Sequence, residues 1–451
     1  MKLYNEAVVK AADAAVRRAI KGALSSLSTR GAVVGIAPAG AGKSYAIGTA
    51  VLAAREKGLR VVVATPTNEQ AYALVHDLAV RLGKRKDKVT FLPAVGRSLP
   101  AVHRHPKVVE SKARDAGAAT IRVGTLDKLG DAFARGDLRG ADLLLIDEAY
   151  QANAVHYYKV AGIAKRHLLM GDSGQLAPFS TAPEADRWRG LAEDPLLRAV
   201  EVLDRNHPGT QKERLPITRR LDPRAVPVVS SFYPGHPFQA AVLPGVRDLT
   251  FRARRSRSWK VEDKLLEHAA LSGWAHAELP ESAVLVDDPA VANLLTRLAK
   301  RLLARGPVTV CERSRKKRKL TQSDIVVVVS HNDQKDRLRI LLDEIGLPDV
   351  VVSTANKVQG LTFEVVLAWH PLAGLQEADE FHLDPGRMCV ILTRHRHACI
   401  VVGREGDRKL VEGIPPPTPA YPGWDLDPAL DGWYAHEGVF NTLSPHRIAV
   451  S

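Results

Sequence analysis

The segment from Ala37 to Ser44 has the residue types and spacing of a phosphate-binding loop, because it reads Ala-Pro-Ala-Gly-Ala-Gly-Lys-Ser. Its glycines would let backbone N–H groups curl around phosphate oxygens, and the helix expected next would present its N-terminus to the anion. Lys43 would reach the β- and γ-phosphates, and the Ser44 hydroxyl would bind Mg²⁺. Ala37 replaces the usual first glycine, a position that only opens the loop. The residues predicted to bind the nucleotide here are Pro38, Ala39, Gly40, Ala41, Gly42, Lys43, Ser44 and Tyr45.

Two acids, Asp147 and Glu148, follow the apolar run Leu143–Ile146. They would stand at the carboxyl end of a buried parallel strand, the edge where such sheets bind ligands. Asp147 could hold the hydration shell of Mg²⁺, and Glu148 could orient or deprotonate the attacking water. Such a pair can also be a plain helix N-cap with a favourable dipole contact. Its place after the loop favours hydrolysis of ATP or GTP.

These residues need a scaffold of buried strands, and the chain has two stretches in which short β-branched apolar runs alternate with helical patterns. Helices are expected at Ser44–Lys57 and Asn68–Leu82, among others. The sequence therefore predicts two α/β halves. Strands are predicted at Ala32–Ala37, Arg60–Thr65, Thr120–Gly124, Asp142–Ile146, His167–Gly171, Asp324–Ser330, Val350–Thr354, Glu364–His370 and Ala398–Gly403.

Composition sets the class of protein. The 451 residues suit two or three domains, and the 45% hydrophobic content indicates sizeable cores. No apolar run approaches the roughly 20 residues that span a bilayer, and the N-terminus lacks a signal-peptide pattern, so no membrane partner is expected. Cys311, Cys389 and Cys399 lack metal-ligand spacing, which predicts no zinc and a cytoplasmic location. The formal charge of +14 fits a nucleic-acid partner as well as simple solubility.

Further motifs, in the same order, resemble those of superfamily 1 helicases, closest to the Upf-like and RecD/Pif-like branch. The resemblance implies two RecA-like P-loop NTPase domains, each a mostly parallel sheet flanked by helices, with ATP and Mg²⁺ as cofactors. Val61–Leu74 resembles motif Ia, and Val123–Thr125 resembles motif Ib. Read singly, both could be ordinary strand-end turns. The nucleic-acid contacts that the resemblance implies in this half are Pro66, Thr67, Asn68 and Thr125.

Gly171–Leu176 resembles motif III, in which Gln175 would sense the γ-phosphate. Leu215–Pro223 resembles motif IV, with Arg220 at the arginine position. The family commonly has an aromatic residue just before that arginine, where it stacks on the base. Here the residue is Arg219, whose guanidinium can also stack. Base selectivity is therefore in question.

Ser353–Glu364 resembles motif V, with Thr354 as a nucleic-acid contact and Gln359 and Gly360 beside the nucleotide. Thr362 stands where many relatives have a glutamate. Arg387–Arg394 resembles motif VI, and its Arg394 would enter the active site from the second domain. The residues predicted to be catalytic are thus Lys43, Asp147, Glu148, Gln175, Arg220 and Arg394, with Ser44 and Asp147 as metal ligands.

The expected domains are an N-terminal RecA-like domain at 1–206, a second RecA-like domain at 207–412, and a Pro-rich linker with a tail at 413–451. Insertions are expected at about 83–118 and about 235–320. Three basic runs, at 84–88, 252–260 and 313–319, could line or flank the nucleic-acid track, or be solvated or disordered loops. The family's adenine-reading glutamine is missing, since none precedes Gln70, so adenine recognition is expected to be weaker or to use other groups near Asn5.

The leading hypothesis is an ATP-dependent helicase or translocase on single-stranded nucleic acid, DNA more than RNA, with 5′→3′ travel suggested by the branch that it resembles. A nucleic-acid-stimulated ATPase that clamps or remodels without unwinding is an alternative. A P-loop kinase or signalling NTPase is a second alternative, but it leaves Arg220 and motifs V and VI unexplained.

Overall fold

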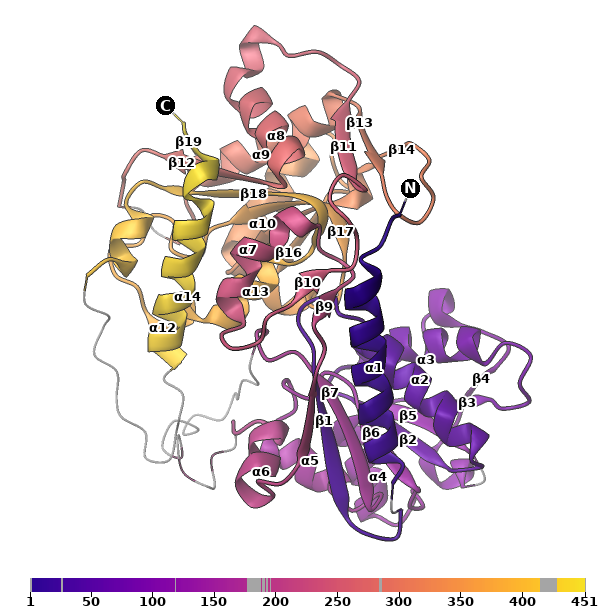
Figure 1. Ribbon diagram of the computed structural model, residues 1–451. Coiled ribbons are helices and arrows are strands. Elements are labelled where there is room, and N and C mark those ends of the chain that lie inside the picture. Colours follow the sequence, from indigo (N-terminus) through magenta and orange to yellow (C-terminus); the bar gives the residue numbers. More distant parts are fainter. Residues whose placement is uncertain are drawn as a thin grey trace.

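The computed structural model describes residues 2–413 and 428–450, except residues 26, 118, 284 and 285 and, within 177–195, all but 188, 191 and 194. Two parallel β-sheets with helices on both faces form two lobes, joined by a narrow connecting region (Figure 1). The chain thus has the α/β class and the two RecA-like domains that the sequence predicts. The predicted Pro-rich linker, with Trp424, lies outside the described residues.

The first sheet has eight parallel strands in the order β4-β3-β5-β2-β6-β7-β1-β8. Its central strands are buried on both faces because alternate side chains enter two apolar clusters. One cluster is closed by α1, α2 and α3, and the other by α4, α5 and α6. The strands are β1 (Gly31–Ile36), β2 (Val61–Thr65), β3 (Val89–Leu92), β4 (Val108–Glu110), β5 (Ile121–Thr125), β6 (Leu143–Ile146), β7 (Arg166–Gly171) and β8 (Gln211–Arg214). The helices are α1 (Glu6–Ala23), α2 (Lys43–Glu56), α3 (Asn68–Leu82), α4 (Leu126–Ala134), α5 (Ala154–Ala161) and α6 (Ala199–Asn206).

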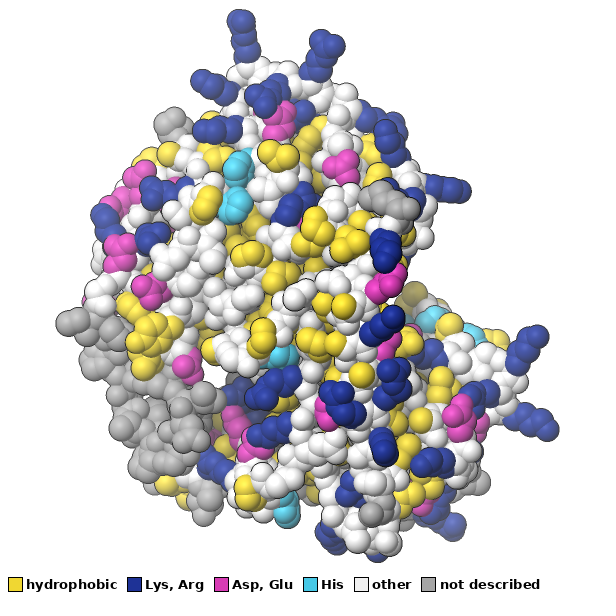
Figure 2. All heavy atoms as spheres, viewed as in Figure 1, with side chains coloured by type: hydrophobic (Ala, Val, Ile, Leu, Met, Phe, Trp, Pro, Cys, Tyr) yellow, Lys and Arg dark blue, Asp and Glu magenta, His cyan; other side chains and the backbone are white. Residues whose placement is uncertain are grey.

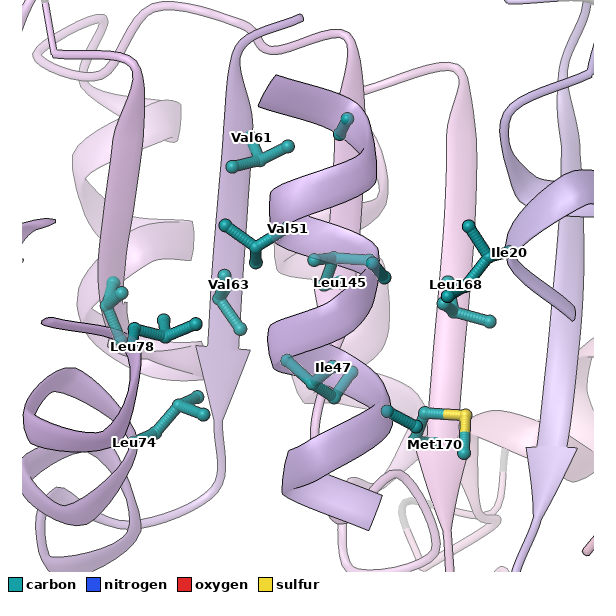
Figure 3. Close-up of a cluster of buried hydrophobic side chains, with 14 of the residues drawn as sticks. Ile20, Ile47, Val51, Val61, Val63, Leu74, Leu78, Leu145, Leu168 and Met170 are labelled. Atoms are coloured by element: carbon teal, nitrogen blue, oxygen red, sulfur yellow. The ribbon is translucent and has the colours of Figure 1, made fainter. Parts of the chain in front are cut away.

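Helix α2 is held firmly on the first sheet. Figure 3 shows Ile47 and Val51 of this helix lying over Val63 of β2, Leu145 of β6 and Met170 of β7. All five side chains are buried. This packing fixes the start of α2, where Lys43 is the first residue of the helix.

The second sheet has six parallel strands in the order β16-β15-β17-β18-β12-β19. One of its apolar clusters is closed by α8, α9 and α10, and the other by α7, α11, α13 and α14. The strands are β12 (Trp274–Leu279), β15 (Ile325–Val329), β16 (Val351–Thr354), β17 (Phe363–Trp369), β18 (His395–Arg404) and β19 (Arg447–Ala449). The helices are α7 (Val226–Val229), α8 (Lys260–Ser272), α9 (Pro289–Ala304), α10 (Asn332–Glu344), α11 (Ala355–Val358), α12 (Glu380–Leu383), α13 (Pro385–Leu392) and α14 (Pro428–Leu443).

Residues 215–243, here called the connector, link the two sheets. They contain the paired short strands β9 (Ile217–Thr218) and β10 (Gln239–Ala240). Beyond the connector, a three-stranded sheet in the order β11-β13-β14 flanks the second domain. Its strands are β11 (Asp248–Phe251), β13 (Pro307–Val310) and β14 (Arg318–Lys319).

The structure changes how the expected domain limits are drawn. Strand β8 pairs with β1 of the first sheet although it lies after residue 206, so we propose a boundary after Arg214. The expected insertion at 235–320 includes the core strand β12. The tail also joins the second domain, since β19 pairs with β12. Within the described residues, no helix combines the length and apolarity that crossing a membrane requires.

Candidate functional site

The loop between β1 and α2 has the backbone shape that the sequence predicts for a phosphate site. Gly40 and Gly42 have φ values of 74° and 97°, in the left-handed region that glycine adopts without strain. Gly40 is also required by crowding, because a Cβ there would lie 2.4 Å from the Cβ of Arg220. The loop therefore curls directly against the motif IV segment.

Four predicted residues of the first domain meet at the start of α2. The ammonium of Lys43 lies 3.4 Å from a carboxylate oxygen of Glu148 and 3.4 Å from one of Asp172. The Ser44 hydroxyl donates a hydrogen bond to Asp147 Oδ2 at 2.8 Å. Hydroxyl and carboxylate oxygens are the ligands that Mg²⁺ takes in proteins, so these two residues fit a shared metal site.

Glu148 is held in an unusual backbone conformation. Its φ is 55°, which costs a non-glycine residue roughly 1–3 kcal/mol and is found mostly at functional sites. Its N–H donates to Asp147 Oδ1 at 3.0 Å, and Ala149 N–H donates to the carbonyl of Met170 in β7 at 2.9 Å. These bonds turn the Glu148 side chain toward Lys43 rather than into the sheet.

Burial sets the electrostatics of this cluster. It raises the pKa of Glu148 to about 7, against the opposing attraction of Lys43. Burial likewise raises the pKa of Asp147. For Lys43, burial works to lower the pKa, but the charges of Glu148, Asp172 and Asp147 outweigh it, and the pKa is raised. The lysine therefore stays charged, whereas Glu148 can gain or lose a proton near neutral pH.

Arg394 approaches the same cluster from the second domain. It is fully buried, with Nε donating to the Val390 carbonyl at 3.2 Å and Nη2 donating to Thr393 Oγ1 at 2.8 Å. Its Nη1 has no hydrogen-bond partner among the described residues. Its charge is close enough to favour the ionised form of Glu148. A buried N–H without a partner, within the electrostatic reach of Glu148, fits a phosphate oxygen.

Arg220 lies where the chain passes from the first domain to the second. Just before it, Arg219 N–H donates to the Gly40 carbonyl at 2.8 Å, whereas Leu221 packs in a core cluster of the second domain. The Arg220 side chain donates to Thr362 Oγ1 at 2.9 Å and to the Thr393 carbonyl at 3.2 Å. The Arg220 side chain thus bonds second-domain groups, whereas its backbone belongs to the connector.

A buried ion pair supports the connector at this point. Arg247 donates from Nε and Nη2 to the carboxylate of Glu312 at 2.9 and 3.0 Å. The same guanidinium donates to the carbonyls of Arg219 and Arg220. Burial works to raise the pKa of Glu312, but the hydrogen bonds and charge of Arg247 outweigh it and lower the pKa to about 2. Glu312 therefore stays ionised at neutral pH. The carbonyls of both motif IV arginines are thereby fixed from the second-domain side.

Motif III meets motifs V and VI across the junction. Gln359 Nε2 donates to Gln175 Oε1 at 3.0 Å, and Gln175 in turn donates to Asp172. Gly386, at the start of α13, lies so close to Leu176 that a Cβ would be 2.6 Å from its backbone nitrogen. Gly360 is exposed, with φ of 83°. The γ-phosphate sensor predicted at Gln175 therefore contacts the second domain directly.

The predicted nucleic-acid residues follow the carboxyl ends of parallel strands. Pro66, Thr67 and Asn68 follow β2, and Thr125 ends the neighbouring strand β5. Thr354 ends β16 in the second sheet. Three of these are also N-cap residues: Thr67 precedes α3, Thr125 precedes α4, and Thr354 precedes α11. The structure puts each at the expected edge and leaves the contact role as a prediction.

Arg219, which lies beside the phosphate loop, also lines a cavity of about 420 Å³. Arg219 lies over Gly42 and pairs with Asp13 of α1 at 3.2 Å. Asn5 is engaged elsewhere, since its side chain donates to Gln239 and accepts from Val8 N–H. Tyr45 is exposed and packs under the guanidinium of Arg81. The cavity is lined by Tyr4, Glu6, Val9, Lys10, Arg219, Ala241, Glu312 and Arg313.

Two basic runs lie away from the predicted track. Residues 84–88 precede β3, at the amino end of that strand. In the run 313–319, Arg318 donates to Glu364 at the start of β17 at 2.8 Å. Residues 84–88 and Arg318 thus lie at the amino ends of strands, away from Thr125 and Thr354, and a role of these runs along the track stays a prediction. Figure 2 shows Lys and Arg side chains spread over both domains, including both sides of the indentation between them.

Two family models, each described as an AAA domain, match residues 15–185 and 288–406. The first match contains the phosphate loop, Asp147 and Gln175, and the second contains Gln359 and Arg394. The two matches, with the motifs in this order, support a superfamily 1 helicase. The phosphate loop lies in the first matched region and the motif VI arginine in the second.

Among solved structures, the helicase is similar to arterivirus nonstructural protein 10, a helicase solved in a complex with DNA. The identity is 15% and the TM-score 0.44, and the match covers 87% of this chain and 64% of the other. The chain thus spans less than two thirds of that structure's length. No curated protein matches the sequence.

Three residues of the helicase site carried no predicted role. Asp172 was part of the motif III pattern without a role of its own, yet its carboxylate accepts hydrogen bonds from Lys43 and Gln175. Thr393 lies between Arg220 and Arg394. Tyr233 comes from the connector, where an aromatic residue in a run of small and apolar residues resembles ordinary core. Only the fold brings Tyr233 to the phosphate loop.

Proposed function

We propose that this helicase couples ATP hydrolysis to movement along single-stranded nucleic acid, DNA more than RNA, in the 5′→3′ direction. The direction rests on the resemblance to the Upf-like and RecD/Pif-like branch. One observation carries the proposal: Lys43 and Glu148 of the first domain share a buried cluster with Arg394 of the second. A site divided in this way works only when the domains close, so its chemistry is tied to domain motion.

The catalytic roles follow from the charges in the cluster. Lys43 is held by two carboxylates, and a triphosphate in the loop would offer it a higher negative charge. Glu148 would then be free to accept a proton from water. Mg²⁺ held by Ser44 and Asp147 would neutralise phosphate charge. Arg220 and Arg394 would stabilise charge on the transferred phosphoryl group, an effect worth roughly 10³–10⁵ in rate for arginine fingers.

Movement follows from the contacts between the domains. Gln175 and Gln359 touch across the junction, so a change at the γ-phosphate reaches motif V directly. Motif V contains Thr354, which ends β16 at the proposed nucleic-acid edge of the second sheet. Opening and closing would change the distance from Thr354 to Thr125 and to Pro66–Asn68 in the first domain. The two edges would then grip the strand alternately.

An exposed aromatic ring near Thr354 supports this track. Val329 of β15 pairs with Thr354 of β16, so His331 emerges at the same sheet edge. Phe381 is 41% exposed, and its ring lies 4.8 Å from that of His331, centroid to centroid. The guanidinium carbon of Arg387 lies 3.6 Å from the Phe381 centroid. An exposed ring backed by a cation suits the apolar face of a nucleic-acid base.

The cavity beside Arg219 is the proposed base site. Its lining offers the Tyr4 ring and the Arg219 guanidinium for stacking, and charged groups in place of a single amide that would read adenine. Such a lining would hold purine and pyrimidine bases with similar strength. We therefore propose that ATP is preferred only weakly over other nucleoside triphosphates.

The test of the proposed function is the ATPase rate with and without single-stranded DNA and RNA of equal length. We expect a severalfold or larger stimulation, more by DNA. Phe381→Ala should weaken binding of single strands about tenfold, by loss of one base contact. Tyr158→Ala is the matched control, because Tyr158 is an exposed ring on α5 of the first domain. An ATPase indifferent to both nucleic acids would contradict the proposal.

A clamp or remodeller without unwinding remains the second candidate, and one observation favours it. The described residues of 83–118 add the short strands β3 and β4 at one side of the first sheet and form no separate strand-splitting domain. Duplexes with a 5′ or a 3′ overhang distinguish the candidates. Unwinding from the 5′ overhang alone supports the helicase activity, and ATPase stimulation without any unwinding supports the clamp.

A further inference from the structure

The hydroxyl of Tyr233 joins three parts of the site. Tyr233 is 4% exposed and follows the short 3₁₀ turn Ser230–Phe232 of the connector. The backbone N–H of Ala39 in the phosphate loop donates to its oxygen at 2.9 Å. The hydroxyl donates to Asp172 Oδ1 of motif III at 2.8 Å. The Sγ of Cys389, on α13 of motif VI, lies 3.5 Å away.

The chemistry of the partners fixes the direction of these bonds. An N–H can only donate, and a carboxylate can only accept, so the tyrosine proton points to Asp172. The Cys389 thiol is then the donor to the tyrosine oxygen. Burial raises the pKa of Tyr233 well above 10 and that of Cys389 to about 12, so both keep their protons at neutral pH. The hydroxyl thus uses its one proton and both acceptor positions.

Tight packing holds the ring in this position. A Cβ on Gly174 would lie 2.6 Å from Cε1 of Tyr233, so motif III has room for the ring only because that residue is glycine. The ring also meets Phe238 edge to face, with centroids 5.2 Å apart. A small displacement of the motif III loop must therefore move the hydroxyl.

Asp172 gives the hydroxyl its link to catalysis. Its Oδ1 accepts from Tyr233 and from Gly174 N–H, and its Oδ2 faces Lys43 and Gln175. Tyr233 and Gly174 therefore fix the rotation of the carboxylate that Lys43 must leave when phosphate arrives. Gln175 continues the chain of bonds to Gln359 in the second domain.

We propose that Tyr233 is a positioning residue that passes the state of the phosphate loop to motifs III and VI, so that phosphate binding and domain closure occur together. The inference rests on the proposed ATPase but on none of its nucleic-acid steps. Tyr233 touches the loop through Ala39 N–H, on the side of the loop that faces the connector. Its loss therefore affects closure more than nucleotide affinity.

Tyr233→Phe tests the proposal, because it keeps the ring and deletes only the hydroxyl. It leaves the buried Ala39 N–H without its acceptor and Asp172 with one fewer donor. We expect kcat for ATP to fall about tenfold, while KM changes by less than about twofold. If wild-type turnover is stimulated by single-stranded DNA, the stimulation ratio should fall too.

Tyr157→Phe is the matched control. Tyr157 is also 4% exposed, and its hydroxyl bonds His167 Nδ1 at 2.8 Å in the first-domain core, away from the site. Both variants should lower the thermal midpoint similarly, but only Tyr233→Phe should lower kcat. Equal effects of the two on kcat, or a Tyr233→Phe enzyme with normal kcat, would overturn the proposal.

Gly174→Ala provides a second route, since it should displace the ring while the hydroxyl remains. It should reproduce the Tyr233→Phe loss of kcat, and a normal kcat would count against the positioning role. If no nucleic acid stimulates the ATPase rate of the wild-type enzyme, the proposed function is refuted, but the role of Tyr233 is not. The kcat comparison without nucleic acid still decides the role of Tyr233.

Discussion

Glu148 should give ATP hydrolysis a pH dependence centred near neutrality. Burial raises its pKa to about 7, and a general base acts only when ionised. The ionised fraction is then about one tenth at pH 6 and about nine tenths at pH 8. Activity should therefore rise with pH, and kcat/KM, which reports the free enzyme, should increase roughly tenfold over this interval.

The assay is steady-state turnover from pH 5.5 to 8.5 at constant ionic strength. The terminal phosphate of ATP also titrates, with a pKa of about 6, so a second enzyme is needed to separate the two groups. Asp172→Asn removes a negative charge that helps to raise the Glu148 pKa, so the inflection should move to lower pH. Glu148→Gln should lower kcat by about 10²–10⁴ and abolish the enzyme's inflection. An inflection at the same pH in all three enzymes would refute the assignment of Glu148 as the base.

Three further outcomes are expected. Lys43→Ala should abolish turnover with an unchanged circular dichroism spectrum, because the lysine acts on phosphate; normal turnover would contradict the phosphate-loop assignment. Arg394→Ala should lower kcat far more than ATP affinity, and equal losses of both would argue against a finger. The pKa values of His276 and His436 are lowered by burial to about 4, so the unfolded chain binds more protons between pH 6.5 and 4, and stability falls as pH falls. Urea midpoints should show a loss of about 1 kcal/mol per histidine at pH 5.5, and an unchanged midpoint would contradict this.

The predicted strands are those buried on both faces, and the sequence identified them because such strands are continuous apolar runs. Strand β12 was missed, since it reads Trp-Ala-His-Ala-Glu-Leu and buries His276 and Glu278 among core residues. Strand β8 was missed for the opposite reason: Gln211–Arg214 is wholly polar because it lies at the sheet edge. Strand β12 alternates apolar and polar residues but lacks the continuous apolar run by which the other buried strands were recognised, and β8 has neither signal.

The site was predictable where its residues lie within short motifs at strand ends. Lys43, Asp147 and Glu148 follow buried strands, and the sheet brings such ends together. Tyr233 is 194 residues from Ala39 and 61 from Asp172, and no local pattern marks it. The sequence also could not predict that Arg220 lies at the junction of the two domains, because only the contacts of its neighbours Arg219 and Leu221 show this.

The placement of Arg220 has a mechanical consequence. The residue before it is hydrogen-bonded to the phosphate loop, and the residue after it packs in the other domain, so Arg220 is at the fulcrum of any swing between them. A point at a fulcrum travels little, whereas Arg394, carried on the moving arm, travels far. An incoming nucleotide would thus meet the Arg220 guanidinium at once, and the Arg394 guanidinium only after the second domain has closed. Nucleotide binding and hydrolysis would then be separate events, and the closure of the second domain would set their order.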